Sequence, residues 1–207
     1  MGQNDIIGAI SYLSDSLAIC RKYNFYDQNP IFHTLQMLGW IHIEQGDYEK
    51  ANRHFEEALG IVQKRRFHPY FISEIYKGLG VIARKQNRLE MAKQHYLAML
   101  TNVQAGLAIP DEFTNHPLWS VAPVASLAVA LGKYELASLL LCAVAAWDKR
   151  HNMPPSYRGM EADEEFMQTN EKTRQQLGSE TFQAAWERGQ ALTVEEGIAL
   201  AMEVCKS

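Results

Sequence analysis

The chain has 207 residues with a formal net charge of −4; 47% are hydrophobic and 21% charged, a composition typical of an ordinary globular protein. A net negative charge gives no sign of the basic stripe that binds nucleic acid. No apolar run approaches the roughly 18 residues of a membrane-spanning helix. We therefore expect no direct nucleic-acid binding and no membrane insertion. A chain of this length can form one domain with a substantial core or a string of about five helix pairs.

Apolar side chains recur at helical spacing in residues 5–23 and predict one amphipathic helix. The stripe consists of Ile6, Ile10, Leu13, Leu17 and Cys20. In the register of the helix pair that follows, this helix is the second half of a repeat whose first helix is missing. We therefore expect the chain to be a fragment of a longer protein, or its apolar face to be covered by a second copy or a preceding repeat.

Residues 32–66 predict two antiparallel helices joined by a tight turn. The apolar and small positions of the pair are Leu35, Leu38 and Gly39 before the turn and Tyr48, Ala51, Phe55 and Ala58 after it. Gly39 and Ala51 are expected where the helices cross, because small residues let two backbones approach. Asp47 follows Gly46 at the turn and is expected to cap the second helix. One such pair cannot bury its apolar face alone and needs stacked neighbours.

A second pair is predicted at residues 72–103. Ala92 follows Ala51 by 41 residues, and Tyr96 takes the position of Phe55. Asn87 stands where the first pair has its turn glycine. Asparagine can also adopt the left-handed conformation that this turn requires.

A loop is predicted at residues 104–118, where Gly, Pro, Asp and Asn cluster. The third pair follows at residues 117–149, with its turn in LGKYELA. Pro123 is expected inside the first helix of this pair, where it removes a backbone hydrogen bond and kinks the helix.

Three further helices are predicted in residues 156–205, for a total of about nine to ten. A polar helix runs to Leu177, and Gly178 and Ser179 are expected to end it and cap the next. Thr193 and Glu196 form a capping box that opens the last helix.

The order Leu-Gly, Gly-Asp-Tyr, Ala, Phe and Ala in residues 33–66 resembles a tetratricopeptide repeat, a unit of about 34 residues. This resemblance implies one all-α domain, a right-handed α-α superhelix with a C-terminal helical cap. The tail at residues 139–204, with the phrase FQAAWERGQALTVEEG, resembles the closing segment of bacterial multidomain signal-transduction regulators of the LuxR-type and ATPase-associated kinds. That resemblance implies a cytoplasmic sensor or interaction region.

The tetratricopeptide resemblance also implies a partner-binding concave face lined by the first helix of each repeat. The candidate binding residues at its groove positions are Gln36, Trp40, Lys77, Arg84, Trp119 and Ser126. Aromatic and arginine side chains are typical of binding hot spots. Lys77, Arg84 and Lys85 indicate an acidic ligand, and the tail helices of residues 182–204 are expected to close the far end of the groove. Alternatively, Trp40 and Trp119 pack against the C-terminal helices.

No catalytic, cofactor or metal-binding motif is present, and the seven histidines are scattered. The cysteines, Cys20, Cys142 and Cys205, show no CxxC spacing and are expected to be reduced and buried in a cytoplasmic protein. The sequence thus predicts a non-enzymatic scaffold without cofactors that binds a protein or peptide partner, or a small effector. The alternative is a structural module that forms a homodimer or fills its groove from within.

Overall fold

The computed structural model describes residues 3–23, 29–64, 67–109, 117–153 and 160–207, and within them the chain forms ten α-helices, one short 3-10 helix and no strand. The helices are α1 (Gln3–Lys22), α2 (Asn29–Glu44), α3 (Tyr48–Gln63), α4 (Pro69–Lys85), α5 (Leu89–Leu107), η2 (Pro117–Ser120, the 3-10 helix), α6 (Ala122–Ala130), α7 (Tyr134–Arg150), α8 (Met160–Leu177), α9 (Ser179–Gln190) and α10 (Val194–Lys206). The all-α class and the predicted helix number are confirmed.

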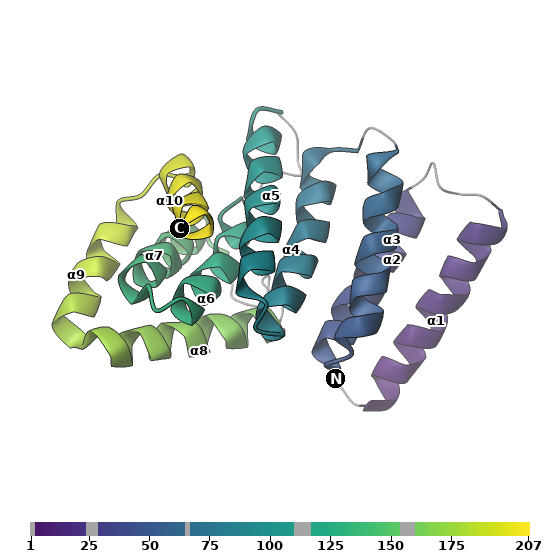
Figure 1. The fold of residues 1–207 in the computed structure, drawn as a ribbon, viewed down its shortest axis with the longest axis horizontal. Helices are drawn as coiled ribbons and strands as arrows, with labels where there is room; N and C mark the ends of the chain where they lie inside the picture. The colour runs from purple at the N-terminus through teal and green to yellow at the C-terminus, as the bar shows by residue number, and fades with distance from the viewer. Residues whose placement is uncertain (1–2, 24–28, 65–66, 110–116, 154–159) are drawn as a thin grey trace.

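The helices are arranged as antiparallel hairpins stacked side by side (Figure 1). The pairs α2–α3, α4–α5 and α6–α7 correspond to the three predicted repeats. At one end of the stack α1 packs chiefly on α2, and at the other end α8, α9 and α10 surround α7.

The three hairpins turn in the same way. Gly46, Asn87 and Gly132 all adopt a positive φ, between 58° and 74°, at equivalent turn positions. This conformation lets the residue after each turn donate a backbone hydrogen bond to the helix before it, as in a Schellman motif. The Asp47 carboxylate then accepts from the Lys50 backbone N–H at 3.2 Å. The predicted cap and the predicted left-handed Asn87 are both confirmed.

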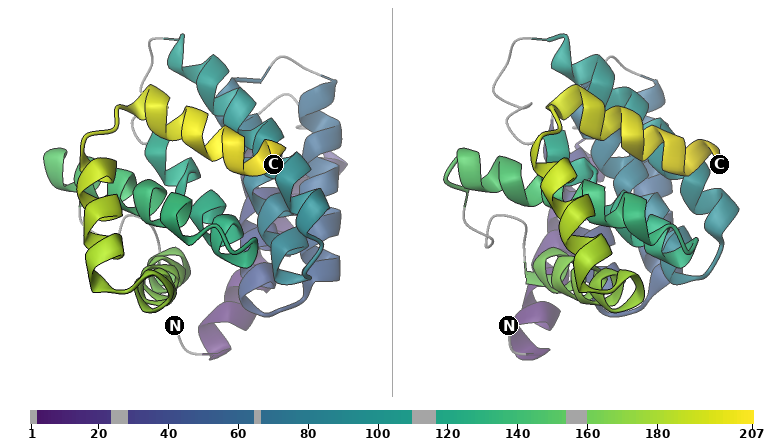
Figure 2. Two further views of the ribbon diagram at one scale, coloured as in Figure 1. Left: turned by 60° about the vertical axis from the view of Figure 1, so that its left-hand side comes forward. Right: turned by 90° about the vertical axis from the view of Figure 1, so that its left-hand side faces the viewer.

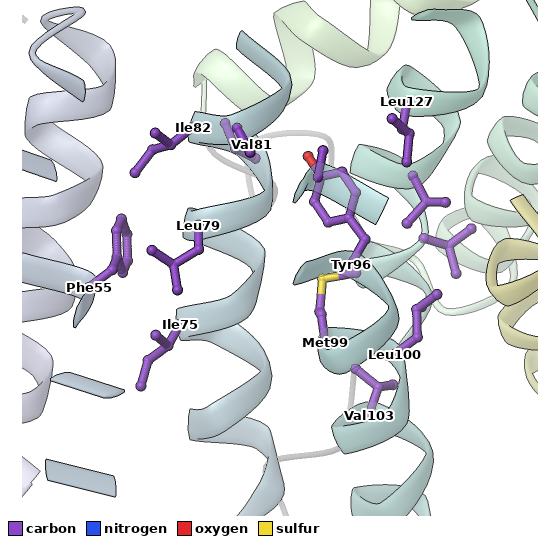
Figure 3. Close-up of a cluster of buried hydrophobic side chains, with 14 of the residues drawn as sticks. Phe55, Ile75, Leu79, Val81, Ile82, Tyr96, Met99, Leu100, Val103 and Leu127 are labelled. Carbon is purple, nitrogen blue, oxygen red and sulfur yellow. The ribbon is translucent and has the colours of Figure 1, made fainter. Parts of the chain in front are cut away.

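The ring of Phe55 fills the space between the first two hairpins (Figure 3). A Cβ built on Gly39 would lie 2.6 Å from this ring, and one built on Gly78 of α4 would lie 2.3 Å from it. Gly80 faces the ring of Tyr96 in the same way, at 2.4 Å. In the first two repeats the glycines of the first helices therefore make room for an aromatic ring of a second helix.

The third repeat differs from its prediction in two respects. Its first helix is divided into η2 and α6, and Pro123 lies in the first turn of α6. A proline in that position removes no intrahelical hydrogen bond, so the expected kink is absent. In addition, α5 continues to Leu107, which shortens the predicted loop of residues 104–118; residues 110–116 of that loop lie outside the described residues.

The three C-terminal helices pack on the last repeat from different sides (Figure 2). Helix α9 approaches α7 closely, because a Cβ on Gly189 would lie 2.6 Å from the Leu139 carbonyl oxygen. Helix α10 packs against α5 and α7 and begins with the predicted capping box of Thr193 and Glu196. Helix α8 ends before Gly178, which has a φ of 74° and is the N-cap of α9, so the expected junction lies at Gly178 and Ser179.

The apolar stripe of α1 faces α2 and is largely covered. Leu13, Leu17 and Cys20 are buried, and Ile10 packs against the core. The expectation that this stripe lacks a partner helix is therefore wrong, because α2 supplies one. Cys142 and Cys205 are buried as well. Within the described part of the chain, no helix is long and apolar enough to cross a membrane.

Candidate binding groove

Four of the six predicted site residues lie near one another on the faces of α2, α4 and η2. They are Gln36 and Trp40 on α2, Lys77 on α4 and Trp119 on η2. Glu74 connects them, because it contacts Gln36 and Lys77 directly, and Lys77 in turn reaches Trp40. We call Gln36, Trp40, Glu74, Lys77 and Trp119 the groove residues.

The contacts around Glu74 neutralise its charge. The Lys77 ammonium lies 2.7 Å from the Glu74 carboxylate, and the Gln36 side-chain amide donates to the same carboxylate at 3.3 Å. The Lys77 nitrogen also lies 5.5 Å from the ring centroid of Trp40, within reach of a cation–π interaction. The Glu74 side chain is only 11% exposed and that of Lys77 23% exposed, so both charges are held in a partly dry setting.

A cavity of about 90 Å³ opens beside this cluster, between the start of α4, the last turns of α5 and η2. Its lining residues are Tyr70, Ser73, Glu74, Lys77, Asn102, Val103, Gly106, Leu107, Pro117, Trp119 and Ser120. Burial and the nearby Glu74 carboxylate raise the pKa of Tyr70 to about 12. Its phenol therefore stays protonated at neutral pH and can donate a hydrogen bond.

The other two predicted site residues, Arg84 and Ser126, lie beneath α8. The Arg84 guanidinium forms an ion pair with Glu165 at 2.5 Å, and the Ser126 hydroxyl lies 3.0 Å from that of Thr169. Phe166, between these contacts, is buried. Helix α8 therefore covers this end of the face formed by the first helices. Of the expected tail segment, residues 182–204, helix α10 packs on α6 and η2.

The expected cationic patch is also absent. Of its three members, Lys77 pairs with Glu74 and Arg84 pairs with Glu165, so two charges are neutralised within the chain. The spacing of Glu74 and Lys77, three residues apart on one helix, could have indicated the first pair from the sequence. The second pair could not be predicted in this way, because Glu165 lies 81 residues from Arg84 and meets it only in the folded structure.

The two predicted tryptophans make different contacts. Trp40 packs edge-on against Phe55, with ring centroids 5.7 Å apart, so it rests on α3 rather than on the C-terminal helices. The Trp119 indole N–H donates to Asp148 of α7 at 2.8 Å. Both rings are half-buried, with one part in the protein and one part at the surface.

Tyr70 and Asn102 line the cavity but were not among the predicted site residues. Asn102 was missed because the candidate positions were taken from the first helix of each repeat, whereas Asn102 lies on α5, the second helix of its pair. Its place at the cavity depends on η2 lying beside α5, which no local sequence signal indicates. Among the described residues, no group of three or more His, Cys, Asp or Glu side chains is placed to hold a metal ion.

Comparisons with known proteins agree with this architecture. Residues 2–64, which span α1, α2 and α3, match the tetratricopeptide repeat family model. The fold as a whole is similar to the crystal structure of BtubC (BKLC) from P. vanneervenii, with a TM-score of 0.57 and 17% sequence identity over 96% of this chain and 90% of that chain. No curated protein sequence matches the chain.

These matches support a specific class of fold. The chain is an all-α superhelix of the tetratricopeptide type, and its N-terminal third matches the repeat family itself. Tetratricopeptide repeats generally mediate protein–protein interactions and are generally not catalytic. At 17% identity, the likeness to BtubC concerns the fold alone.

Proposed function

We propose that this protein is a non-enzymatic scaffold that binds a protein segment or peptide at the groove residues. The observation that supports this most is the cavity of about 90 Å³ that adjoins Lys77, Glu74 and Trp119. It combines an aromatic wall with hydrogen-bonding groups that are already oriented by contacts within the chain. Such a combination favours a ligand with an apolar side chain and a polar backbone.

The size of the cavity favours a peptide over a small effector. Pockets for drug-sized ligands measure roughly 300–1,000 Å³, whereas this cavity is about 90 Å³ and accepts one side chain. The Glu74–Lys77 pair leaves little net charge, so we do not expect the acidic ligand that the sequence suggested. A peptide that inserts one apolar side chain and bonds through its amides fits these features.

The resemblance of residues 139–204 to bacterial signal-transduction regulators supports a proposal about the type of protein to which the scaffold belongs. We propose that the scaffold is the sensor or interaction region of a cytoplasmic bacterial regulator of this kind. Occupation of the groove would then change how the superhelix contacts an output domain.

Helix α8 supports a second function, as an intramolecular docking module. It covers Arg84 and Ser126 through Glu165 and Thr169, so part of the face that would receive a partner is filled by the chain itself. On this alternative, the groove residues serve packing between repeats and bind nothing.

Selection from a displayed library of random short peptides would test the groove directly. Peptides that bind the 207-residue chain should lose most of their affinity for the Lys77→Ala and Trp119→Ala variants, as measured by fluorescence polarisation. Lys77→Ala removes both the ion pair and the contact with the Trp40 ring, so it should weaken binding by roughly 1–3 kcal/mol. Thermal melting of each variant shows whether the fold is retained.

Lys50→Ala is the matched control, because Lys50 also forms an ion pair three residues away, with Asp47, but is well exposed and is not one of the groove residues. It should leave peptide binding unchanged. Selected peptides that bind the groove variants and the control equally would contradict the proposed function. Failure to select any peptide would favour the docking alternative.

A further inference from the structure

The cavity beside the groove residues has small side chains in its walls. It lies where one face of α4, the last turns of α5 and η2 meet. Four of its lining residues are both small and buried, namely Ser73, Val103, Gly106 and Ser120. Small residues at a contact between packed helices leave space that larger ones would fill. The cavity is therefore built into the contact between the second repeat and the start of the third.

The position of Ser73 holds a large apolar residue in the other two repeats. Counted back from the positive-φ residue of each hairpin turn, Ser73 occupies the same place as Phe32 and Leu118, fourteen residues earlier. Phe32 and Leu118 are both 0% exposed. The repeat pattern thus assigns this place to a buried apolar side chain, and the second repeat has a short hydroxyl side chain there instead.

Phe32 shows what fills this place when the apolar side chain is present. Its ring meets that of Phe71, at the start of the next hairpin, with ring centroids 5.3 Å apart. Ser73 lies at the corresponding contact one repeat further along, where α4 faces η2 across the cavity. A serine side chain is too short to fill that contact, so the cavity is the space that remains.

The inner surface of the cavity suits an apolar guest. The Ser73 hydroxyl donates to a backbone carbonyl of its own helix at 2.7 Å, so its need for a hydrogen bond is met within the chain. The charges of Glu74 and Lys77, which also line the cavity, are paired with each other. Val103 and the ring of Trp119 add apolar wall. A guest without polar atoms therefore leaves no buried polar group of the wall without a partner.

The volume of the cavity favours an aliphatic guest over an aromatic one. A cavity of roughly 150 Å³ in a protein interior holds a benzene ring, whereas this one measures about 90 Å³. A leucine or isoleucine side chain has fewer carbon atoms than benzene and fits inside. The ring of a phenylalanine or tryptophan would stay partly outside.

We propose that this cavity is a specificity pocket for one leucine or isoleucine side chain of a bound peptide segment. That side chain takes the place that Phe32 and Leu118 fill in the other two repeats, so the ligand completes the core of the second repeat. The inference rests on the proposed function, because the segment bound at the groove residues supplies the side chain. Ser73 and Val103 are then the residues that set the size of the accepted side chain.

Ser73→Leu fills the pocket from within the chain and tests the inference. Peptides selected on the wild-type chain should bind this variant more weakly by roughly tenfold or more in fluorescence polarisation, because its own side chain takes the place of theirs. Filling a cavity commonly stabilises a fold, so its melting temperature should be unchanged or higher. Ser73→Ala is the matched control, because it removes the same hydroxyl but leaves the space open. It should bind the peptides as the wild type does.

The selected peptides provide a second test, which concerns size. One peptide position should prefer Leu or Ile and lose roughly tenfold or more in affinity when it is replaced by Ala. Phe or Trp at this position should also bind more weakly than Leu. Val103→Ala enlarges the pocket, so it should shift the preference at the same peptide position from Leu toward Phe. Melting curves show whether this variant keeps the fold.

The outcomes separate this inference from the proposed function. Peptides that lose affinity for Lys77→Ala but bind Ser73→Leu as tightly as the wild type would leave the proposed function standing and overturn the pocket. A preference for Phe or Trp over Leu in the wild-type chain would overturn it as well. If Ser73→Leu does not fold, the shift of preference in Val103→Ala decides, and an unchanged preference counts against the pocket. Failure to select any peptide would overturn both the proposed function and this inference.

Discussion

Phe55 shows how one side chain controls the spacing of two repeats. Its ring is fully buried and lies against Gly39 of its own hairpin and Gly78 of the next. Because both neighbours lack a Cβ, α2 and α4 can approach the ring from either side. The same contact between a glycine and an aromatic ring recurs at Gly80 and Tyr96, one repeat further along. The distance between stacked hairpins therefore depends on these positions carrying a hydrogen atom in place of a Cβ.

We expect Gly78→Ala to lower the free energy of unfolding by roughly 1–3 kcal/mol, because the added methyl overlaps a ring that cannot move. Gly60→Ala is the matched control, since Gly60 also lies within a helix but a Cβ there meets nothing within 4 Å. It should be neutral or stabilising by up to about 1 kcal/mol. Urea denaturation measures both values, and equal effects of the two substitutions would contradict the packing described for Phe55.

Two histidines make the stability depend on pH. Burial and the stacked ring of His42 lower the pKa of His54, and burial and Arg88 lower the pKa of His95. Because the folded-state pKa lies below the unfolded value of about 6.5, the unfolded chain binds more protons on acidification. The stabilising effect is complete above about pH 6.5 and is lost as the pH falls toward the folded-state pKa values.

We therefore expect the melting temperature to fall when the pH is lowered from about 7.5 to about 5.5. The double variant His54→Gln/His95→Gln should lose less over the same interval, because it removes two groups that gain a proton on unfolding. Melting curves recorded in a series of buffers give the comparison. Parallel pH profiles for the two proteins would show that other groups control the acid response.

At the scale of elements, the ion pair between Arg84 and Glu165 connects α4 to α8 across the short helix α6. The side chains are 14% and 24% exposed, so the pair lies mostly away from water. Helix α8 is otherwise polar, and Phe166, Thr169 and Thr173 are its buried side chains in the described part of the chain. The pair therefore has a large share in holding α8 over the first helices.

We expect Glu165→Gln to lower the free energy of unfolding by roughly 1–3 kcal/mol, because it leaves the Arg84 charge buried without its counterion. Glu164→Gln is the control: Glu164 is exposed and accepts from Gln168 of its own helix. That substitution should change stability by no more than about 0.5 kcal/mol. If both variants unfold at the same urea concentration as the wild type, α8 is held by its apolar contacts alone.

At the scale of the molecule, stability should be uneven along the stack. In a repeat protein each hairpin is stabilised chiefly by its neighbours. Helices α4 and α5 lie in the middle of the stack, whereas α1 packs chiefly on α2 and is joined to α3 by the Arg21–Glu57 ion pair. The edge helix thus has the fewest interactions that oppose its opening.

We expect the backbone amides of α1 to exchange with deuterium faster than those of α4 and α5 in dilute solution, because local opening of the edge costs less free energy. Hydrogen-exchange mass spectrometry resolves the helices separately. Uniform protection of α1, α4 and α5 at low concentration would contradict this gradient.

The sequence by itself determined the features that depend on neighbouring residues. The hairpins follow from apolar spacing, the Asn87 turn from the left-handed preference of asparagine, and the caps at Asp47 and Thr193 from side chains near their own helix ends. Each of these depends on hydrogen bonds and periodicity within a few residues. The position of Gln36 and Trp40 on the first helix of their repeat was predicted from the resemblance to the tetratricopeptide repeat.

Only the tertiary structure decided which distant residues meet. Gly78 received no role from its own helix, because its importance comes from a ring on α3. Arg84 was placed among the binding residues because the register put it on the concave face, yet Glu165, which is 81 residues away, pairs with it under α8. The cavity likewise needs η2 beside α4 and α5. These contacts depend on the path of the whole superhelix, and local periodicity carries no information about that path.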